Sequence, residues 1–194
     1  MSAISGLLVD MDGTLVDTAT ANYEAYAAAL AAVGVSVSRQ AFDAVALGRN
    51  WRQFLPPLLR AARSGADAAA VAARKAEIYP SKIPLTLVNT PLVALIHTGR
   101  SRWGTALVTT ASSANVTAVL RYHQLEDLFD TIVTGSDVVR HKPDPEAYQT
   151  AAARLGLRAD ECLVIEDSDI GLASANAFGA PCLRITFPSE PLAK

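Results

Sequence analysis

The chain is organised around residues 7–18, which read Leu7-Leu8-Val9-Asp10-Met11-Asp12-Gly13-Thr14-Leu15-Val16-Asp17-Thr18. The first three residues are apolar and form a run short enough for a buried strand. Because residues i and i+2 of a strand point to the same side, Asp10 and Asp12 are predicted to face one way at its carboxyl end. Two like charges so close need a cation or a shared proton, and carboxylate oxygens suit Mg²⁺. Gly13 lets the chain turn sharply and leaves backbone N–H groups to face an anion. The alternative is a polar strand-to-loop junction that binds nothing.

Length and composition are those of an ordinary globular protein. The 194 residues are enough for one domain, or for one domain with a small insert, and 51% are apolar while 19% are charged. The net charge of −2 gives no indication of a nucleic-acid-binding surface. We expect no membrane partner and no signal peptide, and therefore a cytoplasmic location, because no apolar stretch is long enough to span a bilayer and no basic segment precedes the first one. Cys162 and Cys182 lie in apolar segments without metal-ligand spacing and are predicted to be buried free thiols.

Residues 17–84 have the pattern of an all-helical insertion. Apolar residues at helical spacing predict a first helix that Gly34 ends: Tyr23, Tyr26, Leu30 and Val33. Further helices are predicted over 38–47, 51–62 and 67–79, and Pro56-Pro57 is expected to kink or restart the second of these three. Pro80 and Pro84 then frame a linker, and no strand is predicted between residues 17 and 84.

From residue 90 onward the chain alternates between helices and strands. The expected helices are 90–102, with Thr90 as its N-cap, 113–122, with Ser112 or Ser113 as its cap, 145–155 and 170–178. The expected strands are 105–108, 131–134, 162–165 and 181–185. This alternation predicts an α/β fold, a parallel sheet with helices on both faces. The tail Pro188–Lys194 is expected to be loose.

Polar residues close three of the predicted strands. Asp10 and Asp12 follow the first, Thr109 follows strand 105–108, and Glu166 with Asp167 follows strand 162–165. The carboxyl ends of parallel strands meet at one edge of a sheet, so these side chains are predicted to converge on one site. Thr109 offers a hydroxyl at a helix N-terminus, where anions bind; the alternative is a residue that only caps or turns the chain.

Lys142 lies in a stiffened loop, His141-Lys142-Pro143-Asp144-Pro145. A lone lysine is usually a solvated surface charge, but a site with several carboxylates and a phosphate needs a cation to hold it together. Glu166 and Asp167 could merely favour the dipole of the following helix, or they could complete a Mg²⁺ shell opposite Asp10. His141 has only this neighbourhood to suggest a role.

Four segments together resemble the motifs of the haloacid dehalogenase-like (HAD) superfamily, in its phosphatase branch. They are Asp10-Met11-Asp12-Gly13-Thr14, Thr109, Lys142-Pro143-Asp144-Pro145 and Glu166-Asp167-Ser168-Asp169-Ile170-Gly171. The resemblance covers nearly the whole chain. It implies a Rossmann-like core of residues 1–16 and 85–194, and it makes the helical insertion, residues 17–84, a mobile cap.

The resemblance also implies a Mg²⁺-dependent phosphatase acting on a small phosphorylated metabolite. Asp10 would form an aspartyl-phosphate and Asp12 would serve as general acid and base. The hydroxyl of Thr109, the ammonium of Lys142 and backbone groups at Gly13 and Thr110 would bind the phosphoryl oxygens. The implied Mg²⁺ ligands come from the first and fourth motifs: Asp10, Asp12 through its backbone carbonyl, Asp167, and Glu166 through water or Lys142.

Substrate choice would depend on the cap. Arg49 and Asn50, with Arg52 beside them, lie where related proteins send a loop into the active site; a solvated helix face is the alternative. Family mutases that act on glucose phosphate carry a histidine soon after the first motif, where this chain has Asn22. A phosphonate hydrolase would need a cap lysine able to form a Schiff base, and nothing in the sequence around Lys75 or Lys82 marks either one.

The sequence therefore favours a phosphatase for a sugar phosphate or phosphoglycolate. The alternatives are a sugar-phosphate mutase and a non-catalytic phospho-receiver or binding module. Receiver domains also combine acids, a hydroxyl and a lysine, but they lack a helical insertion and carry the phosphorylated aspartate later in the chain. The sequence specifies neither the substrate nor the oligomeric state.

Overall fold

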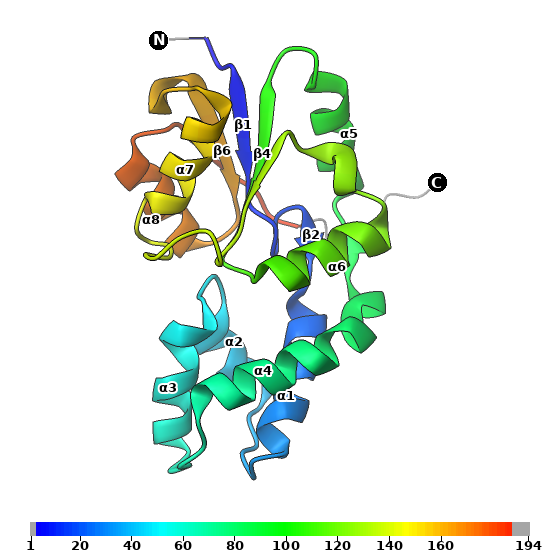
Figure 1. The fold of residues 1–194 in the computed structure, drawn as a ribbon, viewed down its shortest axis with the longest axis vertical. Coiled ribbons are helices and arrows are strands. Elements are labelled where there is room, and N and C mark those ends of the chain that lie inside the picture. The colour runs from blue at the N-terminus through cyan, green and yellow to red at the C-terminus, as the bar shows by residue number, and fades with distance from the viewer. Residues whose placement is uncertain (1–2, 188–194) are drawn as a thin grey trace.

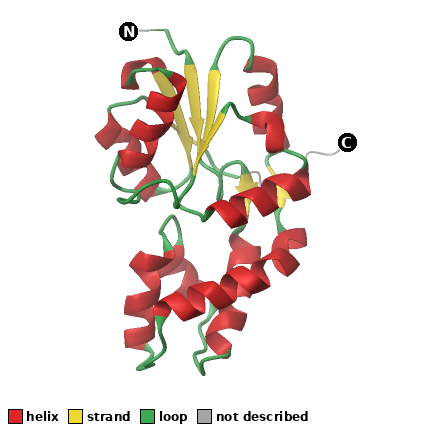
Figure 2. Ribbon diagram, in the orientation of Figure 1, coloured by secondary structure: helices red, strands yellow, loops and turns green. Residues whose placement is uncertain are grey.

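The computed structural model describes residues 3–187 and divides them into a sheet with flanking helices and a separate group of four helices (Figure 1). The predicted loose tail, Pro188–Lys194, lies outside the described residues. The two parts lie one above the other, and the carboxyl ends of the central strands point toward the helical group (Figure 2). None of the helices in residues 3–187 is long and apolar enough to cross a membrane.

The central sheet has five parallel strands in the order β5-β4-β1-β6-β7. Their bounds are Gly6–Val9 for β1, Gly104–Val108 for β4, Thr131–Val133 for β5, Cys162–Glu166 for β6 and Cys182–Arg184 for β7. The predicted α/β fold is confirmed. The strand that carries Asp10 at its end is the middle one, so both of its neighbours can bring residues to that aspartate.

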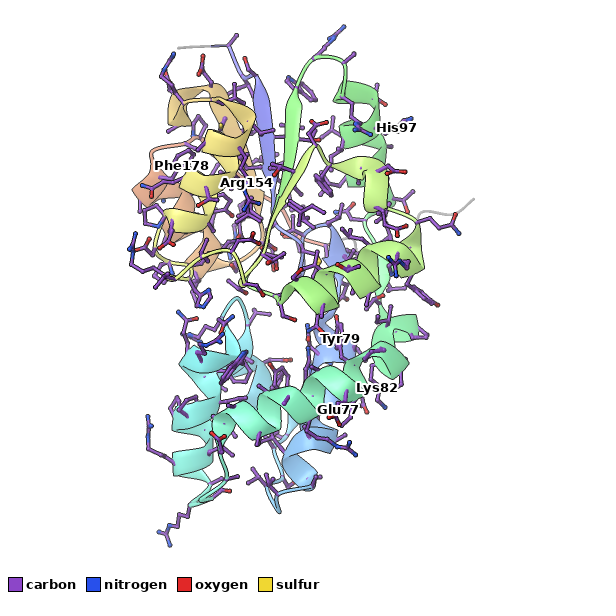
Figure 3. The ribbon with its side chains drawn as sticks, viewed as in Figure 1. Glu77, Tyr79, Lys82, His97, Arg154 and Phe178 are labelled. Atoms are coloured by element: carbon purple, nitrogen blue, oxygen red, sulfur yellow. The ribbon has the colours of Figure 1, made fainter. Side chains whose placement is uncertain are left out.

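Helices cover both faces of the sheet, as predicted. Helices α5 (Thr90–Gly99) and α6 (Ser113–His123) pack over the face that buries Leu7 and Val9 of β1. Helices α7 (Glu146–Leu155) and α8 (Asp169–Phe178) cover the other face, which buries Leu8. Figure 3 shows His97 of α5 on one side of the sheet, with Arg154 of α7 and Phe178 of α8 on the other. Because β1 is covered twice, it is apolar at every position instead of alternating.

Four helices form the second part of the molecule: α1 (Ala19–Ala31), α2 (Arg39–Ala46), α3 (Trp51–Ala61) and α4 (Ala68–Ile78). They enclose a core of their own around Tyr26, Phe42 and Phe54, whose ring centroids lie 5.2–5.7 Å apart. This separation suits tilted and edge-to-face aromatic pairs. The helical region therefore has an apolar centre independent of the sheet.

Several predicted element boundaries are wrong. Asn89, not Thr90, caps α5, because its side chain accepts a hydrogen bond from the N–H of Leu92 at 3.2 Å, and the helix ends at Gly99 instead of residue 102. Helix α3 continues through Pro56 and Pro57 without restarting. The predicted ends of α7 and α8 are confirmed: Gly156 and Gly179 adopt the left-handed conformation that glycine tolerates best.

A small antiparallel sheet at the junction escaped prediction. Strand β2 (Val16–Asp17) pairs with β3 (Leu87–Val88), and the 3₁₀ helices η1 (Tyr79–Leu85), η2 (Glu126–Leu128) and η3 (Ala159–Glu161) fill other connections. Helix η1 replaces the expected irregular linker. Strands β2 and β3 have two residues each and are too short to show alternation, so only the folded chain reveals them. Their pairing joins the two ends of the helical insertion.

Candidate active site

The site lies at the carboxyl ends of β1, β4 and β6, where the sheet faces the helical region (Figure 1). The loops after these strands carry Asp10 and Asp12, Thr109 and Thr110, and Asp167. Glu166 was expected to follow its strand but is the last residue of β6. Parallel pairing of β1 with both neighbours sets the three loops side by side. The convergence expected from the sequence is thus produced by strand order, and Lys142 joins it from the loop before α7.

Lys142 is the most buried cation of the site, with 2% of its surface exposed. Its Nζ donates hydrogen bonds to Asp10 Oδ1 at 2.7 Å, to Glu166 Oε1 at 2.7 Å and to the carbonyl of Val108 at 3.0 Å. Burial alone would lower the pKa of Lys142, but the charges of Asp10 and Glu166 outweigh it and hold that pKa well above its usual value. The lysine is therefore a permanent positive charge beneath the acids, not a solvated surface residue.

Glu166 is fixed by donors on both of its oxygens. Oε1 accepts from Lys142 and from the hydroxyl of Tyr148 at 3.0 Å, while Oε2 accepts from the N–H and hydroxyl of Ser168 at 3.1 and 3.0 Å. Burial raises the pKa of Glu166, but Lys142 and these donors prevail and hold it below its usual value. A Cβ on Gly171 would lie 1.8 Å from Oε1, so only glycine leaves room for this carboxylate. Tyr148 was missed in the sequence, where a helix tyrosine reads as an ordinary core residue.

Three acids could hold a metal ion. Asp10, Glu166 and Asp167 each offer one carboxylate oxygen, and these oxygens lie within 4.8 Å of one another. Burial, followed by the neighbouring Glu166, raises the pKa of Asp10 well above its usual value and that of Asp167 to about 6. Acids crowded and desolvated in this way are relieved by a cation. An all-oxygen donor set fits a hard divalent ion such as Mg²⁺.

Asp12 belongs to a different hydrogen-bond group from Asp10. Its Oδ2 accepts from the Thr109 hydroxyl at 3.0 Å, and its Oδ1 accepts from the hydroxyl of Thr18 and, at 3.4 Å, from the amide of Asn22. Its carboxylate is not part of the three-acid cluster found in residues 3–187. The two acids of this motif, two residues apart, are thus held by different partners. Thr18 is a contributor that the sequence did not single out.

Gly13 has the left-handed φ of +90° that its predicted turn requires. A Cβ there would lie 2.3 Å from Asp167 Oδ2, so the residue also makes space for that acid. The N–H of Gly13 itself donates to the carbonyl of Val16 at 2.9 Å, so other amides of the turn would have to face an anion. The amides of Met11 and Asp12 have no hydrogen-bond partner within the described part of the chain.

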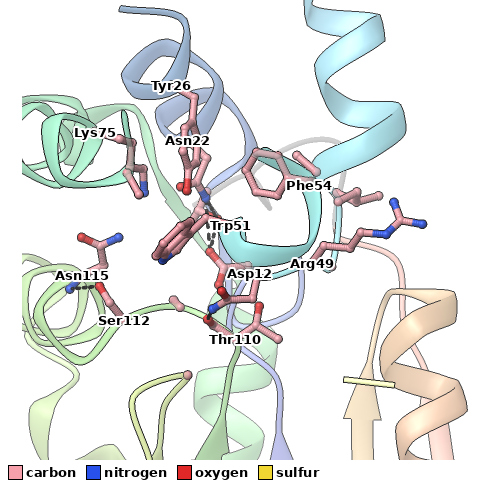
Figure 4. A pocket seen from close by; sticks show the side chains of 18 of the residues that line it. Asp12, Asn22, Tyr26, Arg49, Trp51, Phe54, Lys75, Thr110, Ser112 and Asn115 are labelled. Carbon is pink, nitrogen blue, oxygen red and sulfur yellow. Dashed lines mark hydrogen bonds between the residues drawn. The ribbon is translucent and has the colours of Figure 1, made fainter. Parts of the chain in front are cut away.

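Four other residues that the sequence analysis singled out have varied surroundings. The carbonyl of Thr110 accepts a hydrogen bond from the side-chain amide of Asn50 at 2.9 Å, so Asn50 contacts the core directly. Arg49 curls back to the carbonyl of Val45 at 3.0 Å, and Figure 4 shows it extending away from Asp12. The ring nitrogen Nδ1 of His141 is buried without a hydrogen-bond partner among residues 3–187. Burial and the charge of the cap residue Arg52 lower the pKa of His141, which favours a neutral ring.

A cavity of about 410 Å³ lies between the acids and the helical region (Figure 4). Its floor includes Asp10, Asp12 and Lys142, and its opposite wall includes Trp51 and Lys75. This volume suits a small organic ligand. Lys75 brings a buried cation to the cap side of the cavity, although nothing in the sequence marked it.

A family profile described as haloacid dehalogenase-like hydrolase matches residues 4–179 of this chain. The chain belongs to this family. Among the relatives of this HAD hydrolase, fructose-1-phosphate phosphatase YqaB of Escherichia coli is 31% identical over 181 residues, covering 93% of this chain and 96% of the relative. Phosphoglycolate phosphatase of Yersinia pestis is 29% identical over 194 residues, covering 95% and 82%.

A solved structure shares the fold of this HAD hydrolase. It is CbbY from Rhodobacter sphaeroides in complex with phosphate, with a TM-score of 0.84 and 26% sequence identity, covering 92% of this chain and 84% of that one. The family membership implied by the four motifs is therefore confirmed. In the described residues both cysteines are free, as expected, and Cys162 is buried. The predicted burial of Cys182 is wrong, because that residue is only half-buried.

Proposed function

We propose that this HAD hydrolase is a Mg²⁺-dependent phosphatase that hydrolyses a small phosphomonoester through an aspartyl-phosphate on Asp10. The observation that carries the proposal is the triangle of Asp10, Glu166 and Lys142 at the floor of a ligand-sized cavity. The relatives named as phosphatases of fructose 1-phosphate and phosphoglycolate support a small phosphorylated substrate. We assign the core to residues 1–16 and 85–194 and the cap to residues 17–84.

In the first step, an oxygen of Asp10 attacks phosphorus while the bond between phosphorus and the ester oxygen breaks. Lys142 holds Oδ1 of Asp10 at 2.7 Å, which leaves Oδ2 as the attacking atom. Asp12 protonates the departing oxygen, and Thr109 and Thr18 fix the direction of its carboxyl group. The amides of Met11 and Asp12, which have no hydrogen-bond partner among the described residues, would stabilise the phosphoryl oxygens.

In the second step, Asp12 takes a proton from water, the water oxygen attacks the phosphorus of the aspartyl-phosphate, and the bond to Asp10 breaks to release inorganic phosphate. Asp10 and Asp167, the carbonyl of Asp12 and the nearby Glu166 would hold Mg²⁺. When bound, the ion supplies positive charge that offsets repulsion between the anionic nucleophile and the phosphate. Closure of the cap over the cavity would keep other water away.

The test compares Asp10→Asn with Asp169→Asn, a matched change at an exposed carboxylate that pairs with Arg184 at 2.7 Å. Turnover of p-nitrophenyl phosphate and of a panel of phosphorylated metabolites is measured with Mg²⁺ and after EDTA. We expect Asp10→Asn to abolish turnover with unchanged circular dichroism, Asp169→Asn to remain near wild type, and EDTA to stop the reaction until Mg²⁺ is restored. Near-normal activity of Asp10→Asn would refute the mechanism.

The same panel separates the phosphatase from a mutase. A mutase would convert a sugar 1-phosphate into its isomer with little release of inorganic phosphate, whereas the proposed enzyme releases one phosphate per substrate. Asn22, where the family mutases have a histidine, donates to Asp12 at 3.4 Å. This contact supports a role for Asn22 in holding the acid. The lack of the mutase histidine at this position is what favours hydrolysis over transfer.

A further inference from the structure

Asn50 and Gln53, at the start of α3, each have a side-chain amide whose oxygen and nitrogen bind different parts of the chain. Asn50 Oδ1 accepts from the N–H of Arg52 at 3.1 Å, and Gln53 Oε1 accepts from the N–H of Asn50 at 2.9 Å. Together they form the reciprocal capping box that satisfies free N–H groups at a helix N-terminus. These bonds occupy only the oxygen ends of the two side chains.

The nitrogen ends reach across to the core. Asn50 Nδ2 donates to the carbonyl of Thr110 at 2.9 Å, and Gln53 Nε2 donates to the carbonyl of Lys142 at 3.2 Å. Thr110 follows β4, and Lys142 is the cation that holds Asp10. Asn50 is only 6% exposed, so its amide is largely withdrawn from water. Buried polar groups that lose their partners cost about 1–3 kcal/mol each, so the contact opposes separation unless water replaces it.

The backbone just before this pair also touches the core. Gly48 has a φ of +70°, and a Cβ on it would lie 3.1 Å from the hydroxyl of Ser168, which follows β6. Residues 50–53 thus contact two loops of the catalytic edge, and Gly48 lies close to a third. Because the capping box uses the oxygens and the cross-contacts use the nitrogens, separation of cap from core breaks the cross-contacts and leaves the start of α3 intact.

We propose that Asn50 and Gln53 are positioning residues that clasp the cap to the loops of Thr110 and Lys142 and hold the cavity closed during catalysis. The substrate contact that the sequence suggested for Asn50 stays a prediction, because Asn50 also lines the cavity. The effect of the clasp on turnover rests on the proposed function, whereas the closure itself is measurable without substrate.

The matched variants are Asn50→Asp and Gln53→Glu. Each keeps the oxygen that accepts within the capping box, since aspartate is a good N-cap and glutamate a good third residue. Each replaces the donor with a carboxylate oxygen that faces a backbone carbonyl. The control is Asp67→Asn, which exchanges the same two groups in the opposite direction at the N-cap of α4, where the side chain accepts from the N–H of Ala69.

The readout is the fluorescence of Trp51, which follows Asn50 and lines the cavity. The chain has two tryptophans, so a Trp103→Phe background leaves Trp51 as the only one. We expect acrylamide to quench Trp51 at least twofold more strongly in Asn50→Asp and Gln53→Glu, with Asp67→Asn unchanged. We also expect kcat/KM to fall about tenfold, with a smaller loss of melting temperature in Asn50→Asp than in Asn50→Ala, because aspartate keeps the capping oxygen.

Several results would overturn the clasp. Unchanged quenching in both variants would do so whatever their activity, and so would increased quenching with unchanged kcat/KM. A loss of melting temperature in Asn50→Asp as large as in Asn50→Ala would assign the effect to helix capping instead. If wild-type protein showed no phosphatase activity, the proposed function would fail, but the quenching comparison would still decide whether the clasp exists.

Discussion

Replacing Lys75 with methionine is expected to stabilise this HAD hydrolase at neutral pH. Lys75 is 4% exposed on α4, and its Nζ lies 3.7 Å from the ring centroid of Tyr79 and 5.0 Å from that of Tyr26. Among the residues described, none forms a salt bridge with it. Burial lowers the pKa of Lys75 to about 8, although the charge of Asp12 works in the opposite direction.

The size of the effect follows from this pKa. The difference between the usual 10.5 and about 8 corresponds to about 3 kcal/mol of free energy against the charged amine in the folded state. Cation–π attraction to the two tyrosine rings offsets about 1 kcal/mol of this cost. Methionine has a similar length and is apolar, so Lys75→Met is expected to raise the free energy of unfolding by about 2 kcal/mol.

The sign of the pH dependence is specific. Because the folded pKa of Lys75 lies below the unfolded one, the cost is complete below about pH 8 and declines as the folded amine loses its proton. The difference in free energy of unfolding between Lys75→Met and wild type should therefore shrink by about 1 kcal/mol between pH 7 and pH 9.

Urea unfolding followed by circular dichroism at both pH values measures this difference. Titrations elsewhere in the chain largely cancel between the two proteins. The control is Lys82→Met, because Lys82 is partly exposed and pairs only loosely with Glu24, at 3.9 Å; it should change stability by less than about 0.5 kcal/mol. A destabilised Lys75→Met, or a difference between wild type and variant that stays constant with pH, would refute the reasoning. A stabilised variant with reduced activity would indicate that the buried charge is retained for function.

Two further outcomes are expected. Gly171→Ala should destabilise the protein by about 1–3 kcal/mol and lower kcat, because the new Cβ would lie 1.8 Å from the hydrogen-bonded Glu166 carboxylate. The control for melting temperature is Gly65→Ala, where the Cβ would meet open space. A Gly171→Ala variant with wild-type melting temperature and kcat would contradict this prediction. Burial would raise the pKa of Asp137, but hydrogen bonds from Thr134 and Arg154 prevail and lower it to about 2. Asp137→Asn should therefore cost under about 1 kcal/mol at pH 6, and urea unfolding should show that cost disappearing as the pH falls from about 4 toward 2; a cost that stays constant with pH would contradict the assignment.

Local pattern was sufficient for much of this protein. The apolar run before Asp10 and the carboxylates that follow it predict a strand whose end carries acids, because alternation and burial act within a few residues. The alternation of helices and strands after residue 90 predicts the parallel sheet, and parallel strands bring their carboxyl ends to one edge. The grouping of Asp10, Glu166 and Lys142 could be anticipated for that reason.

What the sequence could not determine depends on contacts between distant residues. Nothing local distinguishes Asn50 and Gln53, whose amides reach the loops of Thr110 and Lys142, from solvated residues at a helix start. The burial of Lys75 against Tyr26 likewise depends on how α4 packs on α1, and is not visible in an alanine-rich helix. Strand order and the approach of cap to core are set by packing over the whole chain, so only the tertiary structure decided which polar side chains share a partner.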